Sequence, residues 1–139
     1  MHKKIIALEL LRSPRVQEPH IIRITDDQVP TVITFNSGSS SLKMSVVQQG
    51  GKVIMVMNCE NIGTPNSKIS FKDCDGTKES IVISMPDHRT AIKEAIALVK
   101  NRCDGLKITA VGHRVGHGGK EFKSSVKITP DDIECISRC

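Results

Sequence analysis

Residues 31–48 read TVITFNSGSSSLKMSVVQ, and this stretch decides the fold. The β-branched run at residues 31–35 predicts a buried strand, and the small polar residues 36–41 predict a tight turn. Residues 42–48 predict a second strand. A third strand is expected at residues 53–58, because Gly50-Gly51 between them is a hairpin signal. Three sequential strands of this kind indicate an antiparallel meander.

Further elements extend the pattern downstream. Weaker strand patterns at residues 68–71 and 80–84 flank a turn at residues 73–76. The clearest helix is expected from Asp87, a plausible cap, to about Arg102, with Gly105 after its end. Its apolar face consists of Ala91, Ile92, Ala95, Ile96, Leu98 and Val99.

The carboxy-terminal third returns to a strand at residues 106–111, which leads into a glycine-rich segment at residues 112–119. A last helix is predicted near Pro130, where Thr129 can cap and proline suits the first turn. Strands followed by a helix and a further strand make this an α/β chain with a mixed sheet.

The bulk composition allows one compact domain, because 139 residues with 38% hydrophobic content leave no room for two. We place the domain at residues 31–139 and treat residues 1–30 as an appendage, since Pro14 and Pro19 break its short apolar pattern. The appendage is expected to add little to the core. No apolar run approaches the ~20 residues of a membrane span, so no membrane partner is expected.

The net charge of +5 is compatible with phosphate-bearing ligands, but only 2% of the residues are aromatic. Scattered basic residues without aromatic side chains for base stacking argue against a nucleic-acid partner. The five cysteines form no C-x-x-C pair, so we expect reduced thiols and a cytoplasmic location.

The turn between the first two strands has the residue types of a phosphate loop. Gly38 permits a tight bend, so that backbone N–H groups and serine hydroxyls can face one anion. Lys43 would add a cation, and the amide oxygen of Asn36 could bind Mg²⁺ directly or through water. The alternative is an ordinary hairpin connector, for which serine and glycine are common.

The glycine-rich segment GHRVGHGG, residues 112–119, follows a predicted strand. Its four glycines exclude a regular helix, so His113 and His117, although four residues apart, do not have the helical geometry of a zinc pair. Arg114 at the strand end could bind a carboxylate or phosphate in a bidentate fashion. A surface arginine beside a flexible loop is the alternative.

Two motifs together, FNSGSSSLK at residues 35–43 and GHRVGHGG at residues 112–119, resemble the amino-terminal signatures of the acetate and propionate kinase family. The similarity continues through residues 121–129 and covers the chain from Thr31 to its end. This resemblance implies the first ribonuclease H-like domain of the actin, sugar kinase and Hsp70 fold, in truncated form.

The resemblance also implies a reaction, the reversible transfer of the γ-phosphoryl group of ATP to a short-chain carboxylate such as acetate or propionate. Its cofactors would be ATP and Mg²⁺, and the full-length family member would be a homodimer. Carried over by motif, the residues near the nucleotide phosphates are Gly38, Ser39, Ser41 and Lys43. Asn36 would assist the metal, Arg114 would bind the acyl substrate, and Gly116 would line the acyl pocket.

Gly116 bears on the choice of acyl group, because residues two apart in a strand point to the same side. Related acetate kinases tend to carry valine there and propionate kinases alanine, so glycine implies a deeper pocket that admits propionate or a longer acid. The alternative is that Gly116 serves only the backbone conformation of its loop.

The family's catalytic Asp, second substrate Arg, metal-binding Glu and nucleotide-binding carboxy-terminal domain have no counterpart before Cys139. No catalytic residue is therefore predicted in this chain, and the isolated chain is expected to be inactive. Two other classes stay open: a non-catalytic module for phosphate binding or oligomerisation, and a small basic RNA-binding protein.

Overall fold

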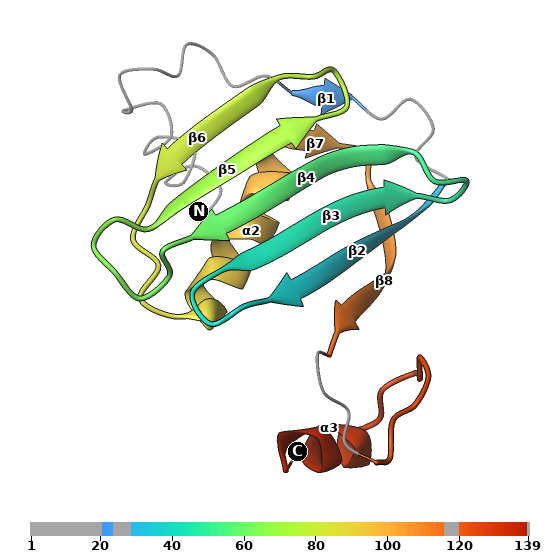
Figure 1. Cartoon of the computed structure of the whole chain (residues 1–139). Helices are drawn as coiled ribbons and strands as arrows, with labels where there is room; N and C mark the ends of the chain where they lie inside the picture. The colour runs from blue at the N-terminus through green and yellow to red at the C-terminus, as the bar shows by residue number, and fades with distance from the viewer. Residues whose placement is uncertain (1–20, 24–28, 116–119, 139) are drawn as a thin grey trace.

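A six-stranded sheet in the order β6-β5-β4-β3-β2-β8 forms the main layer of the protein (Figure 1). The computed structural model describes residues 21–23, 29–115 and 120–138. The predicted helical pattern before residue 21 lies outside the described residues. The strands are β2 (Pro30–Ser37), β3 (Leu42–Gln48), β4 (Val53–Glu60), β5 (Lys68–Asp73), β6 (Lys78–Val82) and β8 (Lys107–Arg114).

Strands β2 to β6 form the predicted antiparallel meander, each strand pairing with the next along the chain. The hairpin signal is confirmed, because Gly50 and Gly51 have φ values of 92° and 90°, which glycine adopts without strain. β8 pairs with β2 in the parallel direction and completes a mixed sheet. The α/β prediction is therefore confirmed.

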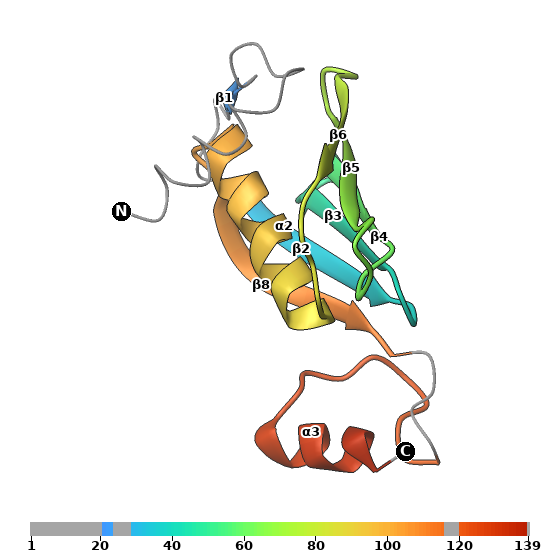
Figure 2. The same ribbon diagram turned by 90° about the vertical axis from the view of Figure 1, so that its left-hand side faces the viewer.

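Helix α2 (His88–Arg102) covers one face of the sheet (Figure 2). Alternate strand residues point toward it, as on β3, where Leu42, Met44 and Val46 are buried and Lys43 is exposed. The helix contributes Ala91, Ala95, Leu98 and Val99 to the core. The opposite face of the sheet, called the open face below, carries no helix among the described residues (Figure 2).

The start of α2 is fixed by Asp87, as predicted from the sequence. Its carboxylate accepts hydrogen bonds from the Thr90 backbone N–H at 2.7 Å and from the Thr90 hydroxyl at 2.8 Å. These two bonds hold the pKa of the Asp87 carboxyl below its ordinary value of 3.8. The cap is therefore strongest when Asp87 is ionised.

Asp87→Asn is expected to destabilise the chain near neutral pH and to lose that effect in acid. Asparagine keeps an oxygen for the cap but removes the charge. Because the folded-state pKa is lowered, the extra stability of aspartate is present above about pH 4 and disappears as the pH falls through the folded pKa. Urea midpoints of both proteins between pH 7 and pH 2.5 measure this, and a constant difference would contradict it.

Ile22 shows that the core reaches beyond the predicted boundary at Pro30. Strands β1 (Ile22–Arg23) and β7 (Cys103–Asp104) form a separate parallel pair. The side chain of Ile22 is only 5% exposed and belongs to the hydrophobic core. The prediction that the amino-terminal segment adds little to the core is wrong for Ile22, and the boundary itself stays a prediction.

Helix α3 (Pro130–Ser137) begins where the sequence predicted, and Thr129 caps it. Thr129 and Asp132 form a reciprocal capping box, which satisfies two otherwise unpaired donors. None of its residues is buried, and it lies apart from the sheet in both views (Figures 1 and 2). Within the described residues, no helix is long and apolar enough to cross a membrane.

The cysteines of the described residues, Cys59, Cys74, Cys103 and Cys135, form no disulfide with one another. Burial raises the pKa of Cys59 to about 11 and, with smaller contributions from neighbouring charges, the pKa of Cys103 to about 12. Both therefore remain protonated at neutral pH and are poor nucleophiles. This agrees with a structural role.

Candidate functional site

The two motifs meet at one edge of the sheet. β2 ends at Ser37 and β8 ends at Arg114, and the two strands are parallel neighbours. Residues 38–41, called the β2–β3 loop below, therefore start beside the end of β8. Ligands of α/β proteins commonly bind at the carboxyl ends of parallel strands.

Three predicted site residues lie side by side in this sheet. Asn36 pairs with Arg114 on β8 and with Lys43 on β3. Residues opposite each other on neighbouring strands are about 4.5–5.5 Å apart and point to the same face. Because Phe35 is buried on the α2 side, Asn36 and its two neighbours point to the open face. An amide thus stands between two cations.

A pocket of about 480 Å³ opens at this position. Its lining residues are Thr34, Phe35, Asn36, Lys43, Ser45, Gly112, His113 and Arg114. In the described part of the chain, no Asp or Glu lines it, while Lys43 and Arg114 do. Its volume lies in the usual range for small-molecule sites, and its charge suits an anion.

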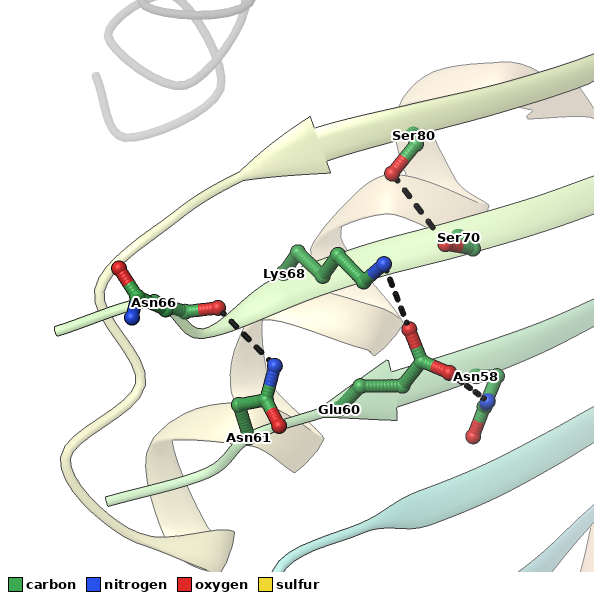
Figure 3. A network of polar contacts seen from close by, with 7 residues as sticks. All are labelled: Asn58, Glu60, Asn61, Asn66, Lys68, Ser70 and Ser80. Carbon is green, nitrogen blue, oxygen red and sulfur yellow. Dashed lines mark hydrogen bonds and ion pairs between the residues drawn. The ribbon is translucent and has the colours of Figure 1, made fainter. Parts of the chain in front are cut away.

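Polar side chains extend the same row across the open face. Lys43 is opposite Asn58 on β4, followed by Ser70 on β5 and Ser80 on β6. Figure 3 shows the far part of this row, where the hydroxyls of Ser70 and Ser80 lie 3.2 Å apart. The row therefore runs from Arg114 to the opposite edge of the sheet.

A carboxylate on this face, that of Glu60, already has partners. Glu60 forms an ion pair with Lys68 at 3.1 Å and accepts a hydrogen bond from the Asn58 amide at 3.0 Å (Figure 3). Neither Lys43 nor Arg114 forms an ion pair with another described residue. Their charges therefore remain available for an anionic ligand.

Carbonyl groups of the β2–β3 loop accept hydrogen bonds within the loop and from the residues beside it. The Ser41 carbonyl accepts from the Gly38 N–H at 2.8 Å, and the Ser40 carbonyl accepts from the Ile62 N–H at 2.9 Å. Among the described residues, the N–H groups of Ser39, Ser40 and Ser41 have no partner. Adjacent unpaired N–H groups can bind one anion, as the phosphate-loop prediction requires.

Sequence reasoning missed His88, the first residue of α2. Its Nε2 lies 2.7 Å from the Gly38 carbonyl oxygen and 3.2 Å from that of Ser41. Sequence reasoning also did not predict the contact between Ser37 Oγ and His113 Nε2, which lie 3.4 Å apart. A histidine directly after the N-cap Asp87 was visible in the sequence, but nothing local connects it with a loop 50 positions earlier.

Gly38 lies at a close approach to a side chain of its own loop. A Cβ atom at this position would lie 2.5 Å from Ser41 Oγ. Gly38→Ala is expected to force the Ser41 hydroxyl into another rotamer and to cost about 0.5–1.5 kcal/mol. In a double-mutant cycle by urea unfolding, Ser41→Ala should remove most of that cost. An equal cost in the Ser41→Ala background would place the clash elsewhere.

The predicted site residues thus fall into three groups. Asn36, Lys43 and Arg114 line one pocket. The loop residues Gly38, Ser39 and Ser41 lie beside it, between β2 and β3. Gly116 lies outside the described residues.

The pocket does not form a metal site by itself. No group of three or more His, Cys, Asp or Glu side chains that could hold a metal occurs among the described residues. Mg²⁺ prefers six oxygen ligands and is usually bound through carboxylates and substrate phosphates. The Asn36 amide oxygen, flanked by two cations, does not meet that requirement.

Comparison with known proteins matches residues 31–139 to the Acetokinase family. The acetate kinase of Lachnoclostridium phytofermentans is 36% identical over 114 residues, which cover 78% of this chain and 29% of that protein. The acetate kinase of Methanosarcina mazei is 35% identical over 114 residues, covering 78% and 28%. Both relatives are named as kinases, so the proteins that this chain resembles are enzymes.

Solved structures agree with this match. The crystal structure of Porphyromonas gingivalis acetate kinase superposes with a TM-score of 0.73 at 32% identity, over 79% of this chain and 29% of that one. A propionate kinase from Francisella tularensis gives a TM-score of 0.67 at 28% identity, over 79% and 28%. The likeness confirms the predicted fold class.

The chain spans less than a third of the length of these relatives, and it matches them over most of its own length. The matched part begins at Thr31, the second residue of β2, and includes both sequence motifs of the site. The chain therefore belongs to the acetokinase family.

Proposed function

We propose that this chain provides the carboxylate-binding and phosphate-binding part of an enzyme that phosphorylates a short-chain carboxylate with ATP. The observation that carries the proposal is the pocket in which Asn36, Lys43 and Arg114 meet beside the β2–β3 loop. The relatives are named acetate kinases and a propionate kinase, so acetate and propionate are the proposed acceptors.

The proposed reaction places a carboxylate oxygen in line with the γ-phosphorus of ATP. A new oxygen–phosphorus bond forms as the bond to the β–γ bridging oxygen breaks, giving acyl phosphate and ADP. Arg114 would bind and orient the carboxylate through two N–H groups. Lys43 and the N–H groups of Ser39, Ser40 and Ser41 would hold phosphate oxygens and offset their charge.

Mg²⁺ would supply further neutralisation of phosphate charge in this enzyme. Since the pocket has no carboxylate among the described residues, the ion would arrive bound to the nucleotide, with Asn36 nearby. The same proposal includes Gly116 in the acyl pocket, a homodimer for the full-length protein and a cytoplasmic location.

The proposal is tested with two proteins, the 139-residue chain and a hybrid in which residues 31–139 replace the matching part of Porphyromonas gingivalis acetate kinase. Acyl phosphate formation is measured by hydroxamate trapping with ATP, Mg²⁺ and either acetate or propionate. The chain alone should not exceed a blank, because no catalytic residue is predicted in it, whereas the hybrid should be active. A folded but inactive hybrid would favour the alternative, a non-catalytic phosphate-binding module.

A further inference from the structure

The β2–β3 loop is contacted by a side chain from a distant part of the chain. His88 lies at the amino-terminal end of α2, and its Nε2 contacts two carbonyl oxygens of the loop, those of Gly38 at 2.7 Å and Ser41 at 3.2 Å. Carbonyl oxygens only accept hydrogen bonds, so Nε2 must carry a proton and donate to both.

We propose that His88 is a positioning residue that sets the β2–β3 loop in its anion-binding conformation. The proposal rests on the proposed phosphate-binding role of that loop. It concerns which group holds the loop, not which groups touch the ligand.

The argument begins with the hydrogen bonds of the loop. His88 occupies the Gly38 carbonyl, the Ile62 N–H occupies the Ser40 carbonyl, and both His88 and the Gly38 N–H occupy the Ser41 carbonyl. The N–H groups of Ser39, Ser40 and Ser41 have no partner among the described residues. Three carbonyl oxygens of the loop are therefore held, while three of its N–H groups are unpaired among the described residues.

His88 is the one side chain among these donors. The Ile62 and Gly38 donors are backbone N–H groups, which a side-chain substitution other than proline leaves in place. Without the imidazole, the Gly38 carbonyl would lose its only partner among the described residues. A carbonyl that is no longer held can turn toward the ligand side, where its oxygen would repel a phosphate.

The position of His88 makes it a firm support. It follows the N-cap Asp87, whose carboxylate bonds to Thr90, and the helix behind it contributes Ala91 and Ala95 to the core. The imidazole is partly buried. A donor that is anchored to a packed helix holds the loop more rigidly than a water molecule could.

The test uses the 139-residue chain and inorganic tripolyphosphate as the probe. Binding is followed by NMR at the backbone amides of Ser39, Ser40 and Ser41. His88→Ala should raise the Kd about five- to tenfold, the effect expected for losing one or two hydrogen bonds. Amide exchange of Gly38, whose N–H bonds to the loop itself, should become faster in the same variant.

Two conservative variants separate positioning from general stability. In His88→Gln the amide nitrogen can occupy nearly the place of Nε2, so this variant should recover most of the affinity. In His88→Asn the shorter side chain cannot reach both carbonyls, so it should resemble His88→Ala. Thr90→Ala serves as the control, because it weakens the same helix end through Asp87 without contacting the loop.

Each outcome decides a different claim. Wild-type affinity in a folded His88→Ala protein, equal recovery by Gln and Asn, or an equal loss in Thr90→Ala would overturn the role of His88. If the wild-type amides do not respond to tripolyphosphate, the phosphate-binding function of the loop fails instead. The positioning role of His88 is then tested by the amide hydrogen exchange of Gly38 alone. An unchanged exchange rate in His88→Ala would reject that role.

Discussion

Glu79→Ala is expected to lower the free energy of unfolding by about 3–5 kcal/mol, because it leaves a buried guanidinium without its counter-charge. The side chain of Arg102 is 2% exposed, and its two terminal nitrogens donate to the Glu79 carboxylate at 2.9 Å and 2.7 Å. Its guanidinium also lies over the Phe71 ring, 5.2 Å from the centroid. Since small domains have about 5–15 kcal/mol in total, this loss approaches the limit of folding.

Variants of Arg102 test whether the expected loss of stability comes from the buried charge. Arg102→Met keeps an apolar chain of similar length over Phe71, and the Glu79 carboxylate it leaves behind is 23% exposed and can be hydrated. It should therefore cost less than Glu79→Ala. The double variant should be more stable than Glu79→Ala alone, as measured by urea unfolding. If Glu79→Ala costs less than Arg102→Met, the buried-charge explanation is wrong.

The elements with local signals were predictable from the sequence. Gly50-Gly51 marked the β3–β4 hairpin, Asp87 marked the start of α2, and Thr129-Pro130 marked the start of α3. Each signal acts over a few residues, through glycine conformations or side-chain caps. The strands they delimit follow from alternation, which explains why the predicted and observed bounds of β3 agree.

The end of strand β8 could not be predicted from its local sequence. The glycine at position 112 suggested that the strand would stop near Val111, but pairing with β2 extends it to Arg114. The parallel partner supplies hydrogen bonds that outweigh the poor strand preference of glycine. This extension brings Arg114 opposite Asn36, so it is also what assembles the pocket.

The contacts that sequence reasoning missed join distant positions. Arg102 pairs with Glu79, His88 holds the loop at Gly38, and Ile22 packs beside Cys103 in the core. A pattern of hydrophobicity cannot show that a charged residue is buried, because burial depends on which strand lies opposite the helix end. Asn36, Lys43 and Arg114 were found by their resemblance to the motifs of a family. Such motifs mark residues that lie close together in the fold, although the sequence alone does not explain why they do.

Arg114→Ala is expected to lower kcat/KM of the hybrid enzyme about 10²–10³-fold for acetate and propionate alike, because the carboxylate loses a bidentate, charge-assisted partner. Arg114→Lys keeps the charge but not the two parallel donors, so it should recover only part of the loss. Lys107→Ala is the matched control, since Lys107 is an exposed cation at the opposite end of β8. Steady-state kinetics with each carboxylate, together with urea unfolding to confirm equal stability, give the measurement. If the surface-arginine alternative holds, Arg114→Ala will behave like Lys107→Ala, and the pocket beside the β2–β3 loop will not be the carboxylate site.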